Sequence, residues 1–169
     1  MDLYLLTNYI GLLAPVILFV LTVFLLRNMY NYLQFFVIGF ILNNIFNIIL
    51  KIAIKEPRPN DEQKKIEIGI VNGAYISFDK FGMPSGHAQN CGFCLSFITL
   101  VLNDLFITTL YASISIISLF QRYFHKMHSI LQLATGLFVG ILLGYLTYLF
   151  GNQYIMGNIK MKKDDNGPL

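Results

Sequence analysis

Long apolar runs set the strongest limit on how this chain of 169 residues can fold. Each run is close to the ~20 residues that a helix needs to cross a bilayer. Charged residues make up only 12% of the chain, about half of their share in soluble domains. The runs lie at residues 9–26, 35–54, 85–102, 105–120 and 128–150. We therefore predict an all-α fold, a polytopic transmembrane helical bundle of about five spans.

The runs predict a single membrane-embedded domain over residues 1–150, followed by a polar and mobile tail over residues 151–169. No basic segment precedes the first run and no small-residue cleavage site follows it, so we expect it to be kept as a span. Pro15 lies inside this run and predicts a kink. The net charge of +3 is too small to indicate a nucleic-acid partner. The expected partner is the membrane, and the oligomeric state stays open.

Two cysteines, Cys91 and Cys94, lie within the third run. A Cys-x-x-Cys pair can bind metal or be redox-active, but inside a membrane helix it is more typical of packing. We predict that both are core residues. The sequence has no cluster of carboxylates at ligand spacing, so we predict no metal site and no cofactor.

A polar stripe follows one face of the second run, formed by Asn43, Asn44, Asn47 and Lys51 at helical spacing. Polar groups are costly in lipid, so the stripe should face the bundle interior. For the asparagines we favour hydrogen bonding between helices. For Lys51, at the end of the run, extension of the amine to the membrane surface competes with a role in a site.

Residues 55–83 form the only long hydrophilic segment between spans. Alternating runs at residues 66–71 and 74–79 flank the turn pair Asn72-Gly73, which predicts a small β-hairpin over the membrane face. A disordered loop is the alternative, but the isoleucine and aromatic content of both runs argues against it.

The start of the third run has the features of an anion site. Pro84 marks a boundary, Ser85 is a good helix N-cap, and His87 falls in the first turn. Backbone N–H groups at a helix start carry partial positive charge, and Gly86 lets an anion approach them closely. Just upstream, two prolines hold Arg58 in an extended segment.

The fifth run carries His128, Gln132, Gly136, Gly140 and Gly144 at intervals of four residues. Glycines at this period are typical of a face where another helix packs closely. His128 and Gln132 continue that face, so we predict that His128 points into the bundle and not into lipid.

Alternating spans place the candidate groups on one side of the membrane. These groups are Lys51, Arg58, Ser85, Gly86, His87, Arg122 and His128. Arginine binds phosphate through a planar fork of donors, and lysine adds a compact charge. One neutral histidine can attack phosphorus while a second, protonated, gives its proton to the leaving oxygen. This set of side chains therefore indicates phosphoryl transfer without a metal ion. The alternative is a basic patch that binds anionic lipid.

Three motifs carry a family resemblance: Lys51 with Arg58-Pro59, Pro84-Ser85-Gly86-His87, and Arg122 with His128. In order and spacing they resemble the signature motifs of the type 2 phosphatidic acid phosphatase superfamily. The resemblance implies that Lys51, Arg58 and Arg122 bind phosphate, with help from Ser85 and Gly86. It further implies that His128 is the nucleophile that forms a phosphohistidine and that His87 is the general acid. Members commonly have six spans, so one would be lacking at the N-terminus here.

Two positions depart from the family pattern. Gln121 replaces the usual serine before Arg122, and Gln132 replaces an aspartate four residues after the nucleophile. A glutamine carbonyl can still accept from the His128 ring N–H and fix its tautomer, but it supplies no negative charge. Without that carboxylate, the cations nearby should lower the pKa of His128 and keep the ring neutral. The change indicates either an impaired enzyme or a branch that uses glutamine, and we favour the branch.

The pattern of that branch is similar to the dolichyl diphosphatases of the endoplasmic reticulum, on the residues Glu56-Pro57-Arg58-Pro59, Gly82-Met83-Pro84-Ser85, Gln89, Gln132 and Gly136. This resemblance implies hydrolysis of dolichyl diphosphate to the monophosphate, at a luminal site, for lipid-linked sugar synthesis. Lys and Arg are too evenly divided between the two sides to set the orientation. The alternatives are a phosphatase of phosphatidate or another lipid monophosphate, and an inactive lipid-binding relative.

Overall fold

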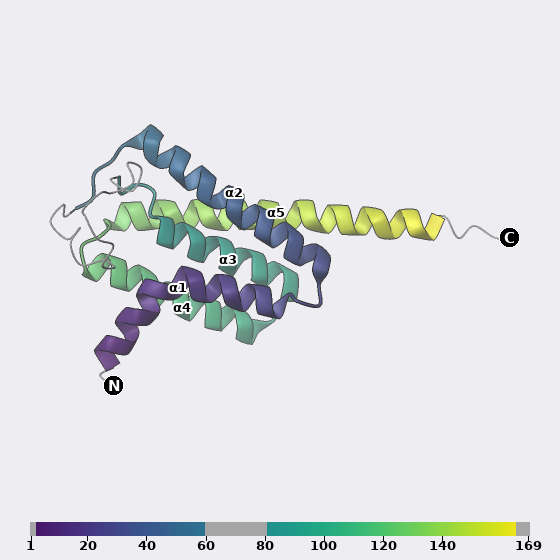
Figure 1. The fold of residues 1–169 in the computed structure, drawn as a ribbon, viewed down its shortest axis with the longest axis horizontal. Coiled ribbons are helices and arrows are strands. Elements are labelled where there is room, and N and C mark those ends of the chain that lie inside the picture. The colour runs from purple at the N-terminus through teal and green to yellow at the C-terminus, as the bar shows by residue number, and fades with distance from the viewer. Residues whose placement is uncertain (1–2, 60–80, 165–169) are drawn as a thin grey trace, which may run out of the picture.

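The computed structural model describes residues 3–59 and 81–164, and the side chains of residues 7–59 and 81–158. This part of the chain folds into α1 (Leu3–Leu25), α2 (Tyr30–Ile54), α3 (Gly86–Leu102), α4 (Leu105–Phe124) and α5 (Ile130–Asp164) (Figure 1). The predicted all-α bundle is confirmed. The predicted hairpin at residues 66–79 lies outside the described residues. The single β-bridge among the described residues joins Pro57 to Phe81.

Membrane character is clear from the helices. Within the described residues α1, α2, α4 and α5 are long and apolar enough to cross a bilayer. The remaining helix, α3, has 17 residues and is shorter than the others. Large apolar side chains such as Val16, Ile38 and Phe138 are exposed on the outer faces of the bundle, as expected of surfaces that meet lipid. The protein is therefore a multi-pass membrane protein.

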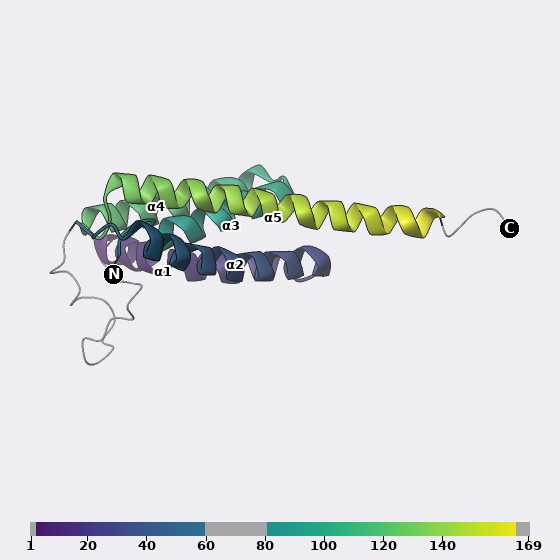
Figure 2. The same cartoon turned by 90° about the horizontal axis from the view of Figure 1, so that it is seen from above.

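The end of the last predicted helix differs from expectation. The predicted end at residue 150 is wrong, because α5 continues to Asp164 and extends past the other helices (Figures 1 and 2). Gly151 does not end the helix, because it lies against the ring of Phe35, and the Tyr32 hydroxyl donates to Asn152 Oδ1 at 3.2 Å. Contacts with α2 thus support this part of α5.

The glycine face of α5 packs against α3, as the four-residue spacing predicted. A Cβ atom added at Gly136 would lie 2.5 Å from the backbone oxygen of Ser85, and one at Gly144 would lie 2.6 Å from that of Phe93. Gly140 lies equally tightly against the backbone of Gln89. These glycines let the two helices approach closely, which fixes the start of α3 beside the start of α5.

The asparagine stripe of α2 joins that helix to α3. Asn47 Nδ2 donates to Gln89 Oε1 at 2.7 Å, and Gln89 Nε2 donates to Asn43 Oδ1 at 2.9 Å. Asn43 Nδ2 in turn donates to Asn90 Oδ1 at 2.7 Å. The predicted hydrogen bonding between helices is confirmed. Cys91 and Cys94 are buried free thiols in the adjoining core, as predicted.

Pro15 changes the hydrogen bonding of α1, which Figure 1 shows to bend along its length. Proline has no N–H, so the carbonyl of Gly11, four residues earlier, loses its helical partner. Ser118 Oγ of α4 donates to this carbonyl at 2.9 Å. The next carbonyl, that of Leu12, lies 3.1 Å from His87 Nε2 of α3. Two successive carbonyls of α1 near the proline thus meet side chains of other helices, and one of these is the candidate site residue His87.

Candidate active site

The candidate residues gather at one end of the bundle. The last turn of α2, the first turn of α3, the last turn of α4 and the start of α5 all lie at the end opposite the C-terminus (Figures 1 and 2). This is the arrangement that alternating spans predicted. Each side chain reaches the common end from a different helix or from the connection that follows it.

The start of α3 is built as the sequence predicted. Ser85 is the N-cap, with φ −66° and ψ 119°, and its hydroxyl accepts from Ala88 N at 3.5 Å. Gly86 is the first helical residue, and a Cβ there would lie 3.3 Å from Asn47 Oδ1. The backbone N–H of Ser85 donates to the carbonyl of Gln132 at 3.1 Å, which fastens this helix start to α5.

His87 and Arg122 are in direct contact. The Nε2 atom of His87 meets the guanidinium of Arg122 and also the Leu12 carbonyl. A guanidinium can only donate and a carbonyl can only accept, so the two contacts require opposite states of this nitrogen. Arg122 is 2% exposed, and its second terminal nitrogen donates to Met127 Sδ at 2.8 Å. His87, the predicted general acid, is thus in contact with Arg122, a predicted phosphate ligand.

His128 lies in the connection between α4 and α5 and is 4% exposed. Its Nδ1 atom is 3.1 Å from Gln132 Oε1, which also accepts from the Ser129 backbone N–H at 3.3 Å. An amide oxygen can only accept, so Nδ1 carries the ring hydrogen and Nε2 keeps a free lone pair. This is the contact expected of a glutamine that orients His128, and it leaves Nε2 unprotonated.

Burial and nearby cations keep the His128 ring neutral. The pKa of His128 is lowered to about 3, first by burial and then by the charges of Arg58, Lys51 and Arg122, against the hydrogen bond to Gln132, which raises it. The predicted direction is confirmed, although burial is a larger cause than the like charges. Lys51 is itself buried, which argues against extension of its amine to the membrane surface.

The contacts of Glu56 and Gly82 with Gln132 were not predicted from the sequence. Gln132 Nε2 donates to Glu56 Oε1 at 2.7 Å and to the Pro57 carbonyl at 2.9 Å. Gly82 lies against the same amide, because a Cβ at Gly82 would be only 2.6 Å from Gln132 Oε1. Both residues belong to the motifs that carry the resemblance to the dolichyl diphosphatases, but that resemblance gave no sign of these contacts.

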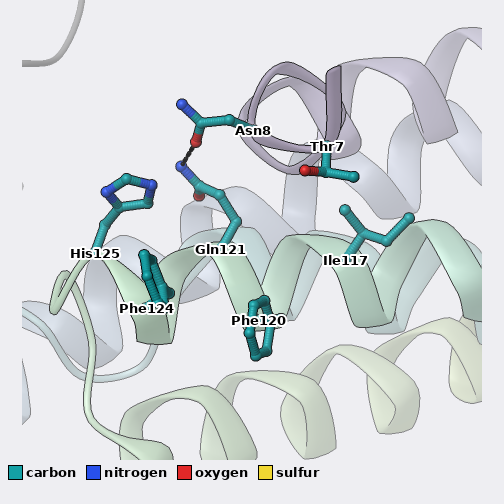
Figure 3. A pocket seen from close by; sticks show the side chains of 7 residues that line it. All are labelled: Thr7, Asn8, Ile117, Phe120, Gln121, Phe124 and His125. Carbon is teal, nitrogen blue, oxygen red and sulfur yellow. Dashed lines mark hydrogen bonds between the residues drawn. The ribbon is translucent and has the colours of Figure 1, made fainter. Parts of the chain in front are cut away.

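Gln121, the other departure from the family pattern, contacts α1. Its amide donates to Asn8 Oδ1 at 2.9 Å across a pocket of about 200 Å³ between α1 and α4 (Figure 3). The pocket is lined by Thr7, Asn8, Ile117, Phe120, Gln121, Phe124 and His125. None of the predicted phosphate ligands lines it. Gln121 therefore joins α4 to α1 at this position.

The fold and this site define a class: a multi-pass helical membrane protein with paired histidines among cations at one end of the bundle. The chain belongs to the PAP2 superfamily, whose family model matches residues 32–155. That range includes every residue of the three motifs and excludes the whole of α1.

Two curated relatives are similar to this chain. It is 29% identical over 132 residues to a protein of Saccharomyces cerevisiae named dolichyldiphosphatase. The aligned region covers 72% of this chain and 51% of that protein. It is 26% identical over 161 residues to a Schizosaccharomyces pombe protein named palmitoyl-protein thioesterase-dolichyl pyrophosphate phosphatase fusion 1, covering 85% of this chain and 23% of that protein. The chain thus spans about half the length of the first relative. No solved structure matches it significantly.

Proposed function

We propose that this chain is an integral-membrane phosphatase that hydrolyses a polyisoprenoid diphosphate of the dolichyl type to the monophosphate. The observation that carries the proposal is the state of His128. Its Nδ1–H is held by Gln132, and its free Nε2 is surrounded by the charges of Lys51, Arg58 and Arg122. A neutral nucleophile among cations suits an anionic phosphorus centre. The names of the two relatives support the substrate class.

In the first step His128 Nε2 attacks the terminal phosphorus of the diphosphate. The new N–P bond forms as the bond from phosphorus to the bridging oxygen breaks, and the lipid monophosphate leaves with that oxygen. Lys51, Arg58 and Arg122 stabilise negative charge on the equatorial oxygens, together with the N–H groups at the start of α3. In the second step water attacks the phosphohistidine, releases inorganic phosphate and restores neutral His128.

His87 supplies the proton for the leaving oxygen. In the free protein, its Nε2 is shared between Arg122 and the Leu12 carbonyl. A phosphate that engages Arg122 removes the donor from this nitrogen and leaves the carbonyl, which can bond only a protonated Nε2. Substrate binding would therefore fix a hydrogen on Nε2, and a proton that the diphosphate brings to Nδ1 would make the ring an imidazolium, which passes that proton to the leaving oxygen. In the second step the same residue takes a proton from water.

The position of the site suits a substrate whose head group is charged and whose tail is apolar. The histidines lie at one end of the bundle, and apolar side chains cover the outer faces of the helices beside them. A long isoprenoid can stay in the lipid while its diphosphate enters from the membrane surface. By analogy with the dolichyl diphosphatases, we place the protein in the endoplasmic reticulum, with the site on the luminal side and a role in protein glycosylation.

The decisive experiment measures phosphate release by purified protein in detergent, with chelator present. Dolichyl diphosphate, farnesyl diphosphate and phosphatidate are compared, and labelled substrate is used to trap a phosphohistidine. We expect both diphosphates to be hydrolysed faster than phosphatidate and the label to be found on His128.

The matched variants are His128→Ala, which should abolish turnover and labelling, and His125→Ala, which should affect neither. Preference for phosphatidate would support the lipid monophosphate alternative instead. Absence of turnover with all three substrates in the folded wild-type protein would indicate an inactive lipid-binding relative.

A further inference from the structure

The amide of Gln132 is fixed by partners on both of its ends. Its oxygen accepts from His128 Nδ1 at 3.1 Å and from Ser129 N at 3.3 Å, and its nitrogen donates to Glu56 Oε1 at 2.7 Å and to the Pro57 carbonyl at 2.9 Å. Gln132 is 1% exposed. Rotating the amide by half a turn would place its N–H groups against two donors and its oxygen against two acceptors. One orientation is therefore strongly preferred.

We propose that Glu56 is a positioning residue for His128 and that its charge acts on the ring through the Gln132 amide. This inference rests on the proposed function. When His128 attacks phosphorus, positive charge develops on the imidazole ring. A carboxylate bonded to the amide N–H polarises the amide and makes its oxygen more negative, which strengthens the bond to His128 Nδ1–H. Glu56 thus supplies, one amide away, the negative charge that Gln132 lacks.

The backbone around Glu56 holds the carboxylate in place. Lys55 ends α2 in the left-handed conformation, with φ 54°, and its N–H donates to the Lys51 carbonyl at 3.0 Å. The next residue, Glu56, accepts from Gly82 N at 2.8 Å through its own carbonyl. Pro57 then pairs with Phe81. These contacts fasten both the residue before Arg58 and the segment before α3, so the carboxylate is presented to Gln132 by a fixed turn.

Other charged and titratable groups act on the His128 ring from the remaining elements. They are Lys51 of α2, Arg58 after α2, His87 of α3 and Arg122 of α4. The cations among them all disfavour positive charge on the ring. Among the described residues, Glu56 is the one carboxylate in the chain of hydrogen bonds that leads through Gln132 to His128. Removal of its charge should therefore weaken the stabilisation of positive charge on the His128 ring.

The test compares Glu56→Gln, Gln132→Glu and the double variant carrying both changes. Glu56→Gln keeps the size of the side chain and an oxygen that can accept from Gln132, but removes the charge. We expect kcat to fall by about ten- to a hundred-fold, the scale of one hydrogen bond to a charged group, with little change in KM. Gln132→Glu places two carboxylates together and should also be impaired. In the double variant Gln at position 56 can donate to a carboxylate bonded directly to His128, so kcat should recover.

The matched control is Asp104→Asn, the same change of acid to amide at the exposed N-cap of α4, where asparagine caps equally well. Its kcat should equal that of the wild type. A second readout needs no turnover: the NMR resonance of the His128 Nδ1 proton should move upfield in Glu56→Gln and stay in place in Asp104→Asn.

The outcomes separate the two proposals. If the wild type and Asp104→Asn release no phosphate, the proposed function fails, and the resonance of the Nδ1 proton alone decides the role of Glu56. If folded Glu56→Gln keeps a kcat within about two-fold of the control, or if its Nδ1 proton resonance is unchanged, Glu56 serves only to hold the turn and the inference is overturned. Failure of the double variant to recover would also overturn it.

Discussion

Gly82→Ala tests whether the Gln132 amide must stay where it is. A Cβ at this position would lie 2.6 Å from Gln132 Oε1, 2.7 Å from Nε2 and 2.8 Å from Cδ. Ordinary contact begins near 3.4 Å, so the amide must retreat by about 0.8 Å. The backbone of Gly82 cannot easily move instead, because its N–H donates to the Glu56 carbonyl at 2.8 Å. The added methyl group therefore acts on the amide without altering any group that meets the substrate.

The size of the effect follows from the bond to His128. That contact is 3.1 Å long, and lengthening it by the required displacement takes it beyond hydrogen-bonding distance. Loss of one orienting hydrogen bond costs about 1 to 3 kcal/mol, which corresponds to roughly a five- to 150-fold loss in kcat. KM should change little, because Lys51, Arg58 and Arg122 are untouched. The crowding itself should destabilise the fold by about 1 to 3 kcal/mol.

The assay is kcat and KM on dolichyl diphosphate, with thermal unfolding in detergent measured on the same preparations. Gly157→Ala is the matched control, because a Cβ there meets nothing within 4 Å. Its activity should equal that of the wild type, and a helical alanine should stabilise it slightly. If folded Gly82→Ala turns over as fast as Gly157→Ala, the amide tolerates the methyl group and the orienting role assigned to Gln132 is wrong.

Three further predictions concern the histidines and the helix packing. The pKa of His128 is lowered to about 3 from about 6.5 in the unfolded chain, so the native state should lose stability as pH falls from 6.5 toward 3; between pH 7 and 5 the Tm of wild type should fall more than that of His128→Asn. His87→Ala should slow release of an alcohol more than release of an activated aryl group, which needs little protonation, and equal losses would exclude the acid role. Gly140→Ala should lower Tm sharply, because its Cβ would meet the backbone of Gln89; an unchanged Tm would contradict the close α3–α5 packing.

Much of the fold could be predicted because membrane burial leaves few choices. Apolar runs become helices, Ser85 caps a helix start, and glycines at a four-residue period allow close packing. The gathering of Lys51, His87, Arg122 and His128 followed from the alternation of spans alone. These features follow from local sequence rules, or from the fact that each span brings the chain to the other side of the membrane. They therefore need no knowledge of long-range contacts.

Other features depend on contacts that the sequence does not reveal. Glu56 meets Gln132 across a separation of 76 positions, and only because Lys55 turns the chain at the end of α2. Gln121 occupies a motif position but points toward α1. The length of α5 was underestimated because residues 151–158 look polar in isolation, whereas contacts with α2 support them as helix. In each case a tertiary contact decided the outcome.

The shortness of α3 has a consequence for the bilayer in which the protein works best. At about 1.5 Å per residue, its 17 residues span about 26 Å, against about 30 Å for an average hydrocarbon core. With Asn103 and Asp104 kept at the opposite surface by their polarity, the start of α3 falls about 4 Å short of the other surface. This hydrophobic mismatch favours thin bilayers, in which the head group of the proposed substrate and the N–H groups of α3 would meet at one depth. Turnover in vesicles should therefore fall as the acyl chains of the host lipid are lengthened.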